Sequence, residues 1–147
     1  MRWLGSLQPV GLLVLRLTLG LVFFTHGYPK LTRATAPIEA MFVAHGLPAR
    51  LVYVAGVFET FGGILLIAGL FTRPTALLLA MEMAVAIVKV HGGRGIMALH
   101  EYEFPLALAA GAVALATLGA GGLSVDRALF GDSGAPRART TRAKKER

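Results

Sequence analysis

The chain contains no cysteine in its 147 residues. It therefore forms no disulfide, thiolate metal site or thiol redox centre of its own, and any sulfur chemistry near it belongs to a substrate or partner. The sequence also contains no P-loop, no Gly-x-Ser-x-Gly and no other nucleotide or hydrolase signature. No His-x-x-x-His or Glu-x-x-His spacing indicates a metal or haem site. Motifs thus predict no metal, nucleotide or hydrolase chemistry.

Hydrophobic residues make up 55% of the chain and lie in four long apolar runs. The runs cover about residues 10–27, 50–71, 74–91 and 103–121. Each is close to the ~20 residues that a helix needs to cross ~30 Å of hydrocarbon. The runs are rich in Leu, Ala and Gly and lack the alternating pattern of barrel strands. The sequence therefore predicts an all-α integral membrane four-helix bundle, in which glycines within the spans allow close helix packing.

Turn residues predict where the helices end. Tyr28-Pro29 should stop the first helix near Gly27. The two-residue link Thr72-Arg73 predicts that the second and third spans form a tight antiparallel hairpin. Between spans 1 and 2, helical spacing predicts a short amphipathic interfacial helix over 35–47, with one face formed by Ile38, Met41, Phe42 and His45.

The basic residues predict the domain organisation and the orientation. We expect a four-span domain over 1–130 and a disordered basic cytoplasmic tail over 131–147. The tail is either a contact for anionic headgroups or a solvated topology signal, and nothing in it indicates nucleic-acid binding. Nine Lys and Arg residues lie on the side of the termini and four on the other, which predicts that both termini are cytoplasmic. This orientation depends on the tail, because the counts without it are three and four.

Charged residues lie inside the apolar runs, where each costs a few kcal/mol unless it is paired or hydrated. At ~1.5 Å per residue, Arg16, Glu82 and Glu59 should lie roughly 9, 12 and 18 Å from the inner membrane face. We expect Arg16 to meet Glu82 and to approach Glu59. This set is either a ligand-binding or proton-relay site, or a structural pair that fixes the register of the helices.

A second group of polar residues is expected on the outer side of the membrane. Glu103 and His91 are its candidate site residues, at the mouth of the bundle. The weaker candidates are His26, Lys89, His100 and Glu101. Lys89 also fits a snorkelling role, and histidines near helix ends are often interfacial. Glu101 and Glu103 point to opposite sides of a helix start, which argues against a paired acid–base site.

Three segments carry short motifs in a characteristic order. They are RLTLGLVFFTHGYPKL at 16–31, FETFGGILLIAGLFTRPTALLLAMEMAVA at 58–86 and EYEFPLALAAGAVALATLGAGGLSVDRAL at 101–129. Together they resemble the DoxX family of small bacterial four-helix membrane proteins. The resemblance implies a multi-pass protein of the bacterial inner membrane that is linked to redox metabolism, with relatives that include a subunit associated with thiosulfate:quinone oxidoreduction. Arg16, Glu59, Glu82 and Glu103 fall within the resembling segments.

Three functional hypotheses follow. The first is an accessory subunit of an oxidoreductase complex, rather than an independent enzyme, that holds a quinone or a small sulfur or oxyanion compound near Arg16, Glu59 and Glu82. The sequence identifies no cofactor, and a quinone is the candidate raised by the resemblance. The second is a small proton-coupled transporter, which the lack of a detectable inverted repeat disfavours. The third is a membrane scaffold for a partner enzyme. The expected partners are the lipid bilayer, a redox protein and further copies of the chain.

Overall fold

The structure is a computed structural model that describes residues 5–32, 35–91 and 99–131. The described residues form helices and no strands. The elements are α2 (Gln8–Thr32), α3 (Thr35–Ala44), α4 (Leu51–Ala68), α5 (Thr72–Ala86), the π-helical η1 (Ile87–His91), α6 (Leu99–Leu118) and α7 (Val125–Phe130). The predicted basic tail, apart from Gly131, lies outside the described residues.

Three helices, α2, α4 and α6, are long and apolar enough to cross a membrane. The fourth predicted span corresponds to α5, which has 15 residues, continued by the five residues of η1. The predicted all-α membrane fold is confirmed. The orientation of the chain in the membrane stays a prediction.

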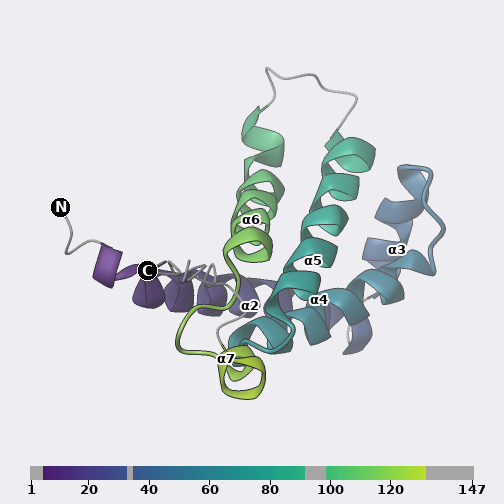
Figure 1. Ribbon diagram of the computed structural model, residues 1–147. Helices are drawn as coiled ribbons and strands as arrows, with labels where there is room; N and C mark the ends of the chain where they lie inside the picture. The colour runs from purple at the N-terminus through teal and green to yellow at the C-terminus, as the bar shows by residue number, and fades with distance from the viewer. Residues whose placement is uncertain (1–4, 33–34, 92–98, 132–147) are drawn as a thin grey trace, which may run out of the picture.

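The long helices form two antiparallel pairs that cross each other (Figure 1). α2 packs along α4, and α5 packs along α6, whereas α4 and α5 touch much less. The tight hairpin of α4 and α5 predicted from their short link is therefore wrong. The prediction fails because Gly69 (φ 70°) and Phe71 (φ 49°) in the link both adopt left-handed backbone conformations, which redirect the chain between α4 and α5.

Four glycines at seven-residue spacing bring the backbones of α2 and α4 together: Gly20 and Gly27 on α2, and Gly56 and Gly63 on α4. A Cβ atom at Gly63 would lie 2.6 Å from the carbonyl oxygen of Gly20, and one at Gly27 would lie 2.5 Å from the amide nitrogen of Thr60. Neither distance leaves room for a methyl group. The predicted use of glycines as a packing device is thus seen between these two helices.

The first helix continues past Gly27 to Thr32, with Pro29 inside it. The predicted end near Gly27 is therefore wrong. Proline removes one backbone hydrogen bond, at a cost that packing can offset. Here Lys30 and Leu31 pack against Gly56 of α4, which holds the last turn in place.

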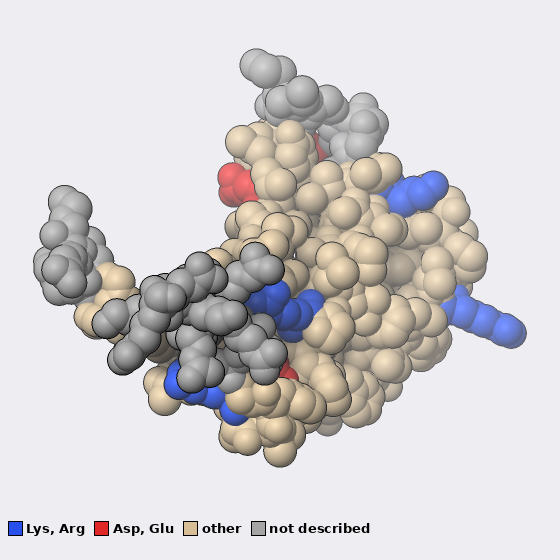
Figure 2. All heavy atoms as spheres, viewed as in Figure 1, with Lys and Arg blue, Asp and Glu red and all other residues tan. Residues whose placement is uncertain are grey.

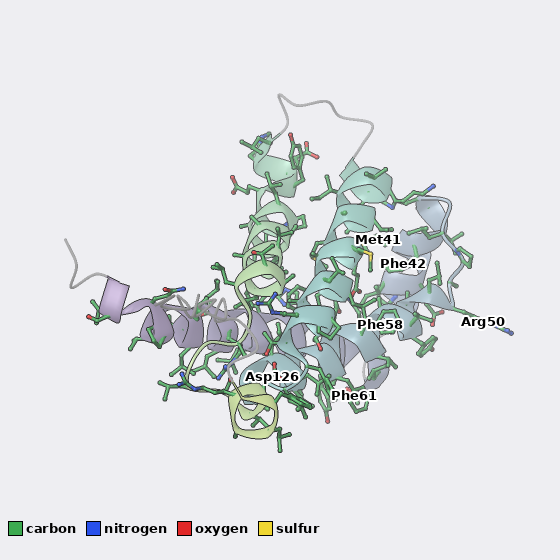
Figure 3. The ribbon with its side chains drawn as sticks, viewed as in Figure 1. Met41, Phe42, Arg50, Phe58, Phe61 and Asp126 are labelled. Atoms are coloured by element: carbon green, nitrogen blue, oxygen red, sulfur yellow. The ribbon has the colours of Figure 1, made fainter. Side chains whose placement is uncertain are left out.

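The remaining apolar surface faces outward, as expected for helices in lipid. Val14, Phe61 and Val88 are 57%, 58% and 68% exposed. Figure 2 shows a surface on which acidic and basic side chains are few and scattered. A short helix between the first two spans is present as α3, which ends at Ala44 and carries Met41 and Phe42 (Figure 3). Its position at the membrane interface stays a prediction.

Candidate functional site

Lys30 and Glu59 form an ion pair within the α2–α4 interface. The Lys30 ammonium donates a hydrogen bond to Oε2 of Glu59, and the two side chains are only 17% and 5% exposed. Gly56 lies nearly one turn before Glu59, and a Cβ atom there would be 3.0 Å from Cβ of Lys30. The close backbone approach at this glycine therefore brings the ammonium group to the carboxylate.

Glu82 of α5 supplies a second carboxylate beside this pair. The charges of both Glu59 and Lys30 act on it. Its Oε2 atom is buried and has no hydrogen-bond partner. We call Lys30, Glu59 and Glu82 the carboxylate cluster. It combines two acidic groups with one basic group in the interior of the helices.

Two further polar groups border the carboxylate cluster. Thr60, next to Glu59, has a buried hydroxyl group without a hydrogen-bond partner. His26 of α2 is close enough for its charge to act on Glu59. Its Nδ1 atom lies 2.8 Å from the carbonyl oxygen of Val22, and its ring lies against Phe104, with centroids 5.5 Å apart. His26, one of the weaker sequence candidates, is therefore a neighbour of the cluster.

An apolar groove of about 180 Å³ opens between α4 and α5. Its lining residues are Val57, Phe58, Phe61, Gly62, Leu65, Thr75 and Leu78. Leu78 lies four residues before Glu82, and therefore on the same face of α5. Phe58 directly precedes Glu59. The groove therefore lies within about one helical turn of the carboxylate cluster.

Arg16 lies in a separate polar network. Its Nη1 and Nη2 atoms donate to the carbonyl oxygens of Ala120, at 2.8 Å, and Leu123, at 2.7 Å. The side chain is 2% exposed. The predicted contact between Arg16 and Glu82 is thus wrong. The reason is that the loop after α6 offers carbonyl groups that have no helical partners.

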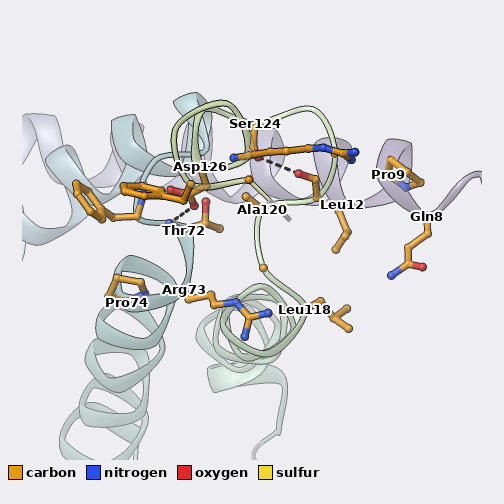
Figure 4. A pocket seen from close by; sticks show the side chains of 17 residues that line it. Gln8, Pro9, Leu12, Thr72, Arg73, Pro74, Leu118, Ala120, Ser124 and Asp126 are labelled. Carbon is orange, nitrogen blue, oxygen red and sulfur yellow. Dashed lines mark hydrogen bonds between the residues drawn. The ribbon is translucent and has the colours of Figure 1, made fainter. Parts of the chain in front are cut away.

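Asp126 of α7 joins the same network to the start of α5. Its two carboxylate oxygens accept hydrogen bonds from the amide groups of Phe71, at 2.7 Å, and Thr72, at 2.9 Å (Figure 4). Its own amide donates to the carbonyl oxygen of Gly69, at 2.8 Å. Its charge also acts on Arg16. We call Arg16, Asp126 and the backbone groups that they bind the terminal clasp.

Three other sequence candidates, Glu103, His100 and Lys89, are exposed and form no hydrogen bond or ion pair with either network among the described residues. Glu101 is half-buried. The side chain of His91 lies outside the described part of the chain. Within that part, no group of three His, Cys, Asp or Glu side chains could hold a metal ion.

Sequence reasoning missed two residues of these networks. The predicted end of the first helix near Gly27 places Lys30 outside that helix. Asp126 lies in the segment 101–129, and no role is predicted for it from the sequence. The available signal was its position two residues after Ser124, which caps α7 by accepting a hydrogen bond from the amide of Arg127.

Comparison with known proteins gives a consistent result. The DoxX family model matches residues 11–92. A Bacillus subtilis protein named "Putative oxidoreductase CatD" is 33% identical over 82% of this chain and 88% of its own length. The Escherichia coli "Inner membrane protein YqjF" is 30% identical over 84% of this chain and 95% of its own length. No solved structure matches the chain.

Proposed function

The chain belongs to the DoxX family of membrane proteins, and on that basis we propose that it is a redox-associated accessory protein of the bacterial inner membrane that binds a quinone at the carboxylate cluster. The observation that carries this proposal is the buried, unpartnered Oε2 atom of Glu82 beside the Lys30–Glu59 ion pair. A buried polar atom without a partner in the protein is a natural place for a ligand to bind. Ionisable residues within a membrane are also functional candidates by default.

The chemistry of the cluster suits a quinone headgroup. The Lys30 ammonium is a hydrogen-bond donor for a quinone carbonyl, and Glu59 keeps that ammonium in position. Two carboxylates and one ammonium leave an excess negative charge, which is costly to bury. We propose that Glu82 therefore holds a proton, which it can donate to the bound carbonyl. Reduction of a quinone to a quinol takes up two electrons and two protons. We propose that a redox partner protein supplies the electrons, that Glu82 supplies one proton and that water at the membrane surface supplies the other.

The groove between α4 and α5 suits the hydrophobic tail of such a ligand. Its volume of about 180 Å³ is below the ~300 Å³ of pockets that enclose a whole small molecule. It is therefore sized for part of an isoprenoid chain whose remainder lies in lipid. Leu78 on the groove lining lies one turn before Glu82 on α5, so a tail bound in the groove would lie next to a headgroup bound at Glu82.

Quinone binding by the purified protein in nanodiscs tests the proposal. We expect a short-chain quinone to bind the wild type and to bind Glu82→Leu about tenfold more weakly, since the hydrogen bond from the protonated carboxyl group is lost. Glu82→Gln should retain binding but lose quinone-coupled activity in membranes, because an amide does not donate a proton in this role. Glu39→Gln, which alters a carboxylate of α3 outside the cluster, is the matched control. Unchanged binding by Glu82→Leu would reject the quinone site, and proton flux in proteoliposomes without quinone binding would favour the transporter hypothesis.

A further inference from the structure

A second pocket, of about 500 Å³, lies at the start of α2, whereas Lys30 lies in the last turn of that helix. Figure 4 shows this pocket from close by. It is formed where the membrane-spanning helices begin and end: the start of α2, the start of α5, the end of α6 and α7. In the topology predicted from the sequence, these helix ends meet at one membrane surface. The pocket is separate from the carboxylate cluster and shares no residue with it.

Two arginines line this pocket, Arg73 at the start of α5 and Arg127 on α7. Both side chains are exposed, and Arg73 extends from α5 toward the end of α6 (Figure 4). Among the described residues, Arg73 forms no ion pair with an acidic side chain. A guanidinium group offers several donors in a fixed plane, which suits the oxygens of a phosphate.

The loop after α6 is shaped around both guanidinium groups. A Cβ atom at Gly119 would lie 3.1 Å from Nε of Arg73, and one at Gly122 would lie 2.8 Å from Nη1 of Arg127. The φ angle of Gly119 is +87°, a conformation that other residues rarely adopt. The absence of side chains at both glycines therefore allows each arginine to lie directly against the loop.

The charges around the pocket are unbalanced. Arg73 and Arg127 line it, and Arg16 lies directly behind it, bonded to the loop carbonyl of Ala120. Asp126 is the acidic residue on the lining, and both of its carboxylate oxygens are occupied by amide groups of α5. Among the described residues on or directly behind the lining, three side chains are thus basic and one is acidic. Thr72, fully buried on the lining, also has a hydroxyl group without a hydrogen-bond partner.

The rest of the lining is apolar. Leu12, Leu118 and Phe130 border the same space as the arginines. A purely hydrophilic anion would leave these side chains uncovered, whereas a lipid would cover them with its glycerol and acyl groups. We propose that this pocket binds an anionic phospholipid, with its phosphate on Arg73 and Arg127 and its apolar part against these three residues.

The test compares lipids that differ in headgroup charge. Wild type and Arg73→Ala/Arg127→Ala are placed in nanodiscs of phosphatidylcholine with and without phosphatidylglycerol, and lipid retained after detergent extraction is counted by native mass spectrometry. We expect wild type to retain phosphatidylglycerol and the double variant to retain about tenfold less, because two charge-assisted contacts are lost. Arg50→Ala is the matched control, since Arg50 projects away from the helices at the start of α4 (Figure 3).

The other outcomes would overturn the proposal. An equal loss in Arg50→Ala would mean that surface charge alone retains the lipid. Equal retention of phosphatidylcholine would reject headgroup selection. Thermal stabilisation of wild type by inorganic phosphate alone, to the same extent as by phosphatidylglycerol, would assign the site to a soluble anion instead of a lipid. Circular dichroism checks that the double variant is folded. A variant with Arg73→Lys in place of Arg73→Ala should retain more phosphatidylglycerol than the double variant.

Discussion

Lys30 at the end of α2 and Glu59 in the middle of α4 form an ion pair that is almost entirely shielded from solvent. Lys30 directly follows Pro29 in α2, and Glu59 carries the most buried carboxylate among the described residues. The pair therefore sets the register between α2 and α4 where the two helices pack through Gly27 and Gly56. Any ligand that binds at Glu82 meets a lysine whose position is already determined.

Breaking this pair on one side only should destabilise the protein. Lys30→Met leaves the Glu59 carboxylate buried without its cation, and such a loss typically costs about 3–5 kcal/mol. Lys30→Met/Glu59→Leu removes both charges, and we expect it to recover most of the stability. The measurement is unfolding of the purified protein in detergent micelles, followed by circular dichroism. If the double variant were as unstable as the single one, the pair would not be the source of the effect.

The candidate site was predictable in part from the sequence, and the failures have identifiable causes. Glu59 and Glu82 could be found because acidic residues inside apolar runs are rare, and the structure brings both together. Lys30 could not be found in this way. The sequence shows that Pro29 disfavours a helix, but it does not show that packing of the last turn against Gly56 offsets this cost. Arg16 was paired with the wrong residue because helix depth does not reveal that loop carbonyls of Ala120 and Leu123 lie within its reach.

The crossing of the two helix pairs also could not be predicted from the sequence. Apolar runs predict four spans, of which three are helices long and apolar enough to cross a membrane and the fourth is α5 continued by η1. Glycine spacing predicts that some helices approach closely. Neither pattern determines which helices pair. The left-handed conformation of Phe71 is unusual for an aromatic residue, and its amide donates a hydrogen bond to Asp126, 55 positions away in the chain.

Glycine substitutions should separate close packing from general helix effects. Gly63→Ala places a methyl group 2.6 Å from the carbonyl oxygen of Gly20, and overpacking of this kind typically costs about 1–3 kcal/mol. Gly11→Ala, in the same helix pair, meets nothing within 4 Å and should be neutral or stabilising. Thermal unfolding in detergent measures both. Equal effects of the two substitutions would argue against close packing of α2 and α4 at Gly63.

Asp126 provides the test of the terminal clasp. Asp126→Ala removes the acceptors for the amides of Phe71 and Thr72 and the charge next to Arg16, so we expect a loss of about 1–2 kcal/mol, as for a helix cap. Asp126→Asn retains one carbonyl acceptor and should lose less. Hydrogen exchange gives the specific readout, because the amides at the start of α5 should exchange faster in Asp126→Ala while those at the centre of α4 do not. Ser124→Ala removes the cap of α7 and the hydrogen bond to the carbonyl oxygen of Gly121 but leaves Asp126 in place, so it is the control and should leave the α5 amides protected. Faster exchange throughout the chain in Asp126→Ala would instead mean that the aspartate acts on global stability and not as a cap of α5.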